Sequence, residues 1–249
     1  MKKLIVTAAA AVAVAYPVGA GAATFKGTVV ERLASRHVLV VAARSGTAWS
    51  VHTTSAARVG AVVTVSATAR RDGTFSGSRV AVTGRAHRAQ LHGVVLQSIA
   101  GLTFLSAGQS VVLVHSHGRA LAAVGSHGPQ PGAVANVGVS IGANGTLNAT
   151  SITTTGQANT IVIQATVTSI TPATATTAGS LTLSVNGQTL TVALAPGMTV
   201  PATLAPGSTV TLTISFASGN PTGTSAEDDD NNENDQGDDS DSGSSSGSD

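Results

Sequence analysis

The chain of 249 residues has no cysteine, few aromatic residues and almost no acidic residues outside its C-terminal end. Without cysteine, no disulfide can hold the fold together. Stability must then come from buried aliphatic side chains, which the 42% hydrophobic content allows. Before Glu227 the only acids are Glu31 and Asp72, and residues 120–226 carry no charged side chain. All 13 lysines and arginines lie at or before Arg119. Charge therefore divides the chain into a basic first part, a neutral stretch and an acidic end.

The shortage of carboxylates argues against enzymatic activity. A nucleophile and its base usually need a carboxylate to orient the base. Asp72 is explained as a turn residue, because Asn144 takes its place in a similar segment, and Glu31 is predicted to face solvent on a strand. No glycine-rich phosphate loop with a lysine occurs, since no lysine follows Lys26. We therefore predict a non-catalytic binding or structural protein of unknown ligand, without a cofactor.

Residues 1–22 have the features of a secretory signal peptide. Lys2 and Lys3 precede an apolar run, and Ala20-Gly21-Ala22 supplies a small-residue cleavage site. The alternative, an N-terminal membrane anchor, needs a span of about 20 residues, and the apolar run is shorter. We expect a secreted or extracytoplasmic protein of the bacterial envelope, with no transmembrane segment after cleavage.

Internal self-similarity predicts the architecture. Asp72-Gly73-Thr74-Phe75 matches Asn144-Gly145-Thr146-Leu147. Phe25 to Val30 matches Leu91 to Leu96, and this second match has a spacing of 66 residues. A third copy follows, in which Ala165 replaces the glycine of the other two. The pair Asn186-Gly187 between alternating strands predicts a type I′ hairpin.

Abundant Val, Thr, Ser and Gly indicate an all-β protein, and five short strands per copy suit a small barrel. A glycine inside the first strand of a copy allows the sharp bend that a closing sheet requires. The pattern resembles the tandem OB-like repeats of exported bacterial proteins, a domain family of unknown function, so the resemblance implies a fold and no catalytic residues. An Ig-like β-sandwich is the alternative.

The expected organisation has five parts. They are a signal peptide at 1–22, a basic OB-like repeat 1 at 23–88, repeat 2 at 89–157, an uncharged repeat 3 with a degenerate last strand at 158–218, and a disordered, low-complexity acidic tail at 219–249.

Histidines offer a weak metal-binding alternative. His115 and His117 would lie on one side of a strand, and His127 could supply a third ligand. No carboxylate lies nearby in the sequence, so solvated polar residues explain the same pattern.

Arginine dominates the basic part and favours bidentate contact with phosphate or carboxylate. The candidate polyanion-binding residues are Arg32, Arg36, Arg44, Arg58, Arg70, Arg71, Arg79, Arg85 and Arg88. A solvated basic face that binds no specific ligand explains the same pattern and is the first interpretation. The alternative is a polyanion-binding face, for which an anionic envelope polymer is favoured. Single-stranded nucleic acid is less favoured, because such sites use aromatic stacking platforms that this chain scarcely has.

Two further expectations concern the uncharged and acidic parts. Repeat 3 lacks the charged edge residues that discourage strand pairing, which allows self-association. The acidic tail is expected to solubilise the chain, and as an alternative to mask the arginine face.

Overall fold

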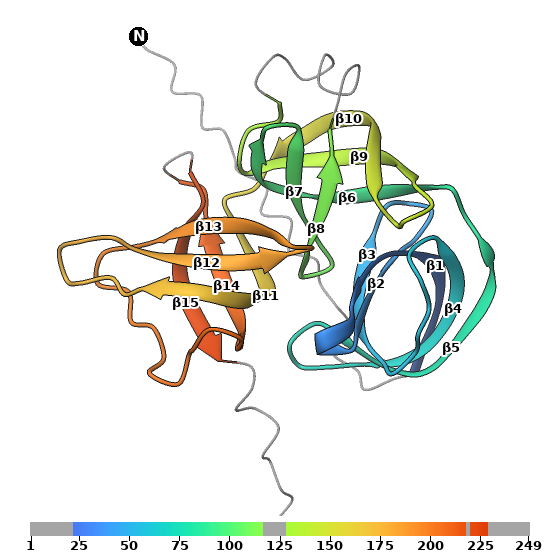
Figure 1. Ribbon diagram of the computed structural model, residues 1–249, viewed down its shortest axis with the longest axis horizontal. Coiled ribbons are helices and arrows are strands. Elements are labelled where there is room, and N and C mark those ends of the chain that lie inside the picture. Colours follow the sequence, from blue (N-terminus) through green and yellow to red (C-terminus); the bar gives the residue numbers. More distant parts are fainter. Residues whose placement is uncertain (1–21, 117–127, 218–219, 229–249) are drawn as a thin grey trace, which may run out of the picture.

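The computed structural model describes residues 22–116, 128–217 and 220–228, and this part of the chain is all-β (Figure 1). Strands β1 to β15 are accompanied by one short 3₁₀ helix, η1 (Ala34–Arg36). No helix in these ranges is long and apolar enough to cross a membrane. The expected signal peptide lies outside the described residues except for Ala22, where β1 begins.

The first five strands form a closed barrel in the order β1-β2-β3-β5-β4. Neighbours are antiparallel except β3 and β5, which are parallel. The strands are β1 (Ala22–Leu33), β2 (Val38–Ala42), β3 (Ala48–His52), β4 (Ala61–Ala69) and β5 (Phe75–Arg85). Aliphatic side chains and Phe75 fill the interior. The closed barrel excludes the β-sandwich alternative for this part, which we call the first unit.

The other ten strands form one sheet in the order β10-β9-β6-β7-β8-β11-β12-β13-β15-β14. The sheet has two halves, β6 to β10 and β11 to β15. An additional pairing of β8 with β10 closes the first half into a ring, and a pairing of β11 with β14 closes the second. Each half then repeats the pairing order of the first unit, including one parallel pair. The second unit comprises β6 (Arg88–Ile99), β7 (Leu102–Ala107), β8 (Ser110–His115), β9 (Ala133–Ile141) and β10 (Leu147–Gln157). The third comprises β11 (Thr160–Thr171), β12 (Gly179–Val185), β13 (Gln188–Leu194), β14 (Thr209–Ser215) and β15 (Thr222–Asp228).

The turns follow the sequence pattern closely. Asp72 Oδ1 accepts hydrogen bonds from the backbone N and hydroxyl of Thr74 at 2.9 and 2.7 Å. Asn144 Oδ1 does the same with Thr146 at 3.1 and 2.7 Å. Asn186 and Gly187 have φ of 49° and 75°, as a type I′ turn requires. These turn predictions are confirmed.

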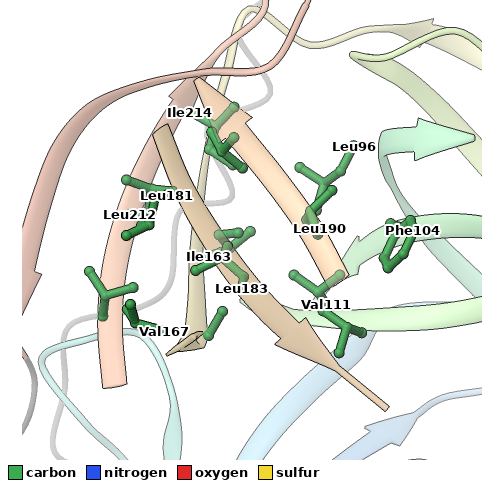
Figure 2. Close-up of a cluster of buried hydrophobic side chains, with 14 of the residues drawn as sticks. Leu96, Phe104, Val111, Ile163, Val167, Leu181, Leu183, Leu190, Leu212 and Ile214 are labelled. Carbon is green, nitrogen blue, oxygen red and sulfur yellow. The ribbon is translucent and has the colours of Figure 1, made fainter. Parts of the chain in front are cut away.

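A β-bulge in the first strand of each unit fastens the units together. In β1 the bulge leaves Val30 between Val29 and Glu31, and Val30 packs into the second unit's hydrophobic cluster. In β6 the bulge residue Leu96 packs into the third unit's cluster, near Leu190 (Figure 2). At the matching bulge of β11 stands Thr168, which is exposed. An apolar bulge residue thus occurs where a following unit covers it.

The prediction of a degenerate last strand in the third unit is wrong. Strand β15 pairs with β14 from Ser215↔Thr222 to Val210↔Asp228, and it also pairs with β13. The strand has no alternation of apolar and polar residues, and it is held by backbone pairing. Its buried residue Gly223 packs against Leu194 and Leu212. Glu227 and Asp228 therefore belong to a strand and not to the tail. The remainder of the predicted tail, 229–249, lies outside the described residues.

Candidate functional site

Three of the predicted arginines lie around one hollow, of about 1010 Å³, between the first and second units. Arg32 is near the end of β1, Arg58 precedes β4 and Arg85 ends β5. The backbone brings them together, since Gly60 N donates to Val29 O and Ala86 N donates to Gly60 O, both at 2.8 Å. The first hydrogen bond joins the segment between Arg58 and β4 to β1 near Arg32, and the second joins the same segment to the residue that follows Arg85.

The hollow combines positive charge with an apolar wall. Arg32, Arg58 and Arg85 are exposed, and none forms an ion pair with an acid within residues 22–116, 128–217 and 220–228. Val82, which is 59% exposed, contributes apolar surface, and the Asn144-Gly145 turn of the second unit forms another side. Uncompensated guanidinium groups suit phosphate or carboxylate oxygens, to which they donate two hydrogen bonds at once.

The other candidate arginines do not join this group. Arg36 donates to the backbone and side-chain oxygens of Gln164 in the third unit, at 3.3 and 3.2 Å. Arg70 forms an ion pair with Asp72 at 3.6 Å. The rest are exposed and do not line the hollow: Arg44, Arg71, Arg79 and Arg88.

Glu31 is buried, and the prediction that it faces solvent is wrong. Its exposed fraction is 1%. The bulge at Val30 pairs Glu31 with Val40, whose side chain lies on the outer face of the barrel, packed against the second unit. The side chain of Glu31 therefore lies on the outer face of the first barrel. That face is buried because the second and third units cover it. Burial raises the pKa of Glu31 to about 7, although the hydrogen bond from Asn186 opposes the shift.

The carboxyl group of Glu31 is only half satisfied. Asn186 Nδ2, from the β12–β13 turn of the third unit, donates to Glu31 Oε2 at 3.0 Å. Glu31 Oε1 is buried and has no hydrogen-bond partner among the described residues. An unpaired buried carboxyl oxygen is costly in a structural core, so its position needs explanation.

All three units meet around a smaller pocket of about 240 Å³, which we call the junction pocket. Glu31 and Arg32 line it from the first unit, His115 and Leu147 from the second, and Asn186 from the third. The junction pocket and the arginine-lined hollow share four wall residues: Arg32, Val59, Asn144 and Gly145. The two spaces are therefore adjacent.

The predicted histidine metal site receives little support. His115 ends β8, is half-buried and lines the junction pocket. His117 and His127 lie outside the described residues. Within the part of the chain that the structure describes, no three His, Cys, Asp or Glu side chains are grouped to hold a metal ion.

Sequence reasoning missed Glu31 as a site residue. The available signal was an isolated acid directly after two valines. Asp72, by contrast, has the predicted turn role, and its Oδ2 also accepts a hydrogen bond from Gln164 Nε2 at 3.4 Å.

Comparisons with known proteins give no family. No family model matches the chain, and no curated protein matches it. Among solved structures, Drosophila Unr CSD456 is 14% identical, with 83% of this chain and 97% of that chain covered and a TM-score of 0.20. A likeness of that degree supports no conclusion about fold or function.

Proposed function

We propose that this chain is a non-catalytic binding protein whose ligand is an anionic polymer, held by Arg32, Arg58 and Arg85. One observation carries the proposal: three exposed guanidinium groups surround a single hollow without an acidic partner among the described residues. Each ring of five strands is, on this proposal, an OB-like barrel, because the same pairing order with one parallel pair recurs in all three units.

A phosphodiester polymer without bases fits the hollow better than single-stranded nucleic acid does. Base recognition relies on aromatic stacking. Phe25 packs against Trp49 and Phe75, with ring centroids 4.5 and 5.3 Å apart, and none of these rings lines the hollow. Export to the bacterial envelope, proposed from the N-terminal residues 1–22, would place the protein among such polymers.

Removing the three arginines of the hollow should abolish most binding. We expect Arg32→Ala/Arg58→Ala/Arg85→Ala to bind poly(glycerol phosphate) at least about tenfold more weakly than the wild type at low salt. The matched control, Arg44→Ala/Arg71→Ala/Arg79→Ala, removes the same charge from exposed positions outside the hollow. It should bind within about twofold of the wild type, and fluorescence anisotropy with labelled polymer measures both.

Equal losses in the two triple variants would mean that net charge, and not the hollow, attracts the polymer. Wild-type protein that fails to bind poly(glycerol phosphate) at low ionic strength would overturn the proposal. Tighter binding of oligo(dT) than of poly(glycerol phosphate) would instead favour nucleic acid.

The acidic end of the chain is proposed to compete for the same arginines. Residues 229–249 contain eight acids and follow directly after β15. Deletion of 229–249, which keeps Glu227 and Asp228 in β15, should tighten binding of poly(glycerol phosphate) several-fold at low salt. The difference should disappear at high salt, where screening weakens the competition. Unchanged low-salt affinity would leave the tail as a solubilising segment only.

A further inference from the structure

We propose that the junction pocket is a proton-dependent subsite of the arginine-lined hollow, in which the protonated carboxyl group of Glu31 donates a hydrogen bond to an oxygen of the bound anionic polymer. The inference rests on the proposed function and names a specificity-determining residue for it.

The hydrogen-bond geometry assigns the proton to one oxygen. Glu31 Oε2 accepts from Asn186 Nδ2, so in the protonated acid the hydrogen lies on Oε1. Oε1 is the buried oxygen without a partner among the described residues. The protonated carboxyl group thus carries a donor that no described group accepts, in the wall of a pocket large enough for a ligand group.

Because the junction pocket adjoins the arginine-lined hollow, a polymer bound in the hollow lies close to Glu31 Oε1–H. Arg32 and Val59 line both the hollow and the junction pocket, as does the Asn144-Gly145 turn. A phosphate group paired with Arg32 therefore lies beside the junction pocket. Because Oε1 has almost no accessible surface in the unliganded protein, the proposal requires the side chains around Glu31 to shift on binding so that a phosphate oxygen can accept from Oε1–H. An ionised Glu31 would present negative charge to the same oxygen and would oppose binding.

Protonation near neutral pH makes this subsite sensitive to pH. Burial raises the pKa of Glu31 to about 7, so the donor form predominates below that pH. Binding an acceptor to Oε1–H raises the pKa further, and affinity must therefore fall as pH rises through 7. The charged and titratable groups around the pocket are Arg32 on the same strand, Arg58 next to Val59, and His115 from β8. His115 is the other titratable side chain that lines the pocket.

The test measures binding of labelled poly(glycerol phosphate) to the full chain at about pH 5.5, 7 and 8.5, since phosphodiesters keep their charge across this range while Glu31 changes its own. Glu31→Gln keeps a donor at the same place without a titration. We expect wild-type affinity to fall on the order of tenfold more than that of Glu31→Gln between the extremes, so that the variant binds more tightly at high pH. His115→Asn is the control for the other titratable side chain of the pocket and should retain the wild-type difference between about pH 5.5 and 8.5.

Five results would overturn the inference. An unchanged pH dependence in Glu31→Gln would remove Glu31 from the site, and loss of that dependence in His115→Asn would assign it to the histidine. Affinity that increases with pH would contradict a protonated Glu31 as the donor. Absence of wild-type binding at every pH would refute the proposed function itself. Arginine-dependent binding without the Glu31 effect would refute only the subsite.

Discussion

Replacing Gly27 by alanine is expected to lower the free energy of unfolding of the first unit by at least about 3 kcal/mol, because the new Cβ meets backbone. A Cβ at Gly27 would lie 2.5 Å from Ala42 O and 2.9 Å from Ala42 C. The next residue, Thr28, pairs with both β2 and β4, so the strand bends there to close the barrel. The backbone of β2 cannot move away from the new Cβ without breaking its hydrogen bonds with β1.

Gly93 occupies the matching place in the second unit, where a Cβ would overlap Ser106 O still more closely. Gly93→Ala should therefore destabilise the second unit by a similar amount. Gly84→Ala is the control, since no atom lies within 4 Å of the place that a Cβ would take there. That variant should change stability by less than about 0.5 kcal/mol. Denaturant unfolding followed by circular dichroism measures all three, and wild-type stability in Gly27→Ala would contradict the account of barrel closure.

Glu31→Gln is expected to stabilise the protein at alkaline pH by about 3 kcal/mol. The folded pKa of Glu31, about 7, exceeds its ordinary value of 4.5. Between these pH values the unfolded chain loses the proton while the folded chain keeps it, so stability falls as pH rises. The stabilisation that protonated Glu31 contributes to the folded state is fully present below about pH 4.5 and is lost above about pH 7. A glutamine avoids the buried charge and keeps an oxygen for Asn186.

Unfolding midpoints at about pH 4.5 and pH 8 test this sign. The variant and the wild type should agree at the lower pH and diverge at the higher one. Glu227→Gln, at an exposed carboxyl group of β15, should show no such divergence. A Glu31→Gln variant no more stable than the wild type at pH 8 would mean that the carboxylate is solvated and not buried.

Local signals predicted the local features. The Asp72-Gly73 and Asn144-Gly145 segments share a sequence and a turn, because the side-chain oxygen and the positive φ of glycine depend on adjacent residues only. The all-β class followed equally from composition. Strand β15 was missed because its seven residues, from Thr222 to Asp228, bury little apolar surface and pair through the backbone.

The candidate site depended on contacts between distant segments. The burial of Glu31 results from a bulge at Val30 and from covering units that lie far along the chain, with Asn186 155 residues away. The nine candidate arginines are alike in sequence, and only the folded arrangement of the first two units brings Arg32, Arg58 and Arg85 around one hollow. The periodicity of side chains within one strand predicts neither the burial of Glu31 nor the grouping of the three arginines.

The central claim, that the arginine-lined hollow binds an anionic polymer, is tested most directly by mapping backbone amide NMR shifts during titration with poly(glycerol phosphate) at low salt. We expect perturbed signals at Arg32, Arg58, Arg85 and the Asn144-Gly145 turn, with little change at Arg44 and Arg79. Shifts spread evenly over exposed arginines, or concentrated away from the hollow, would contradict it.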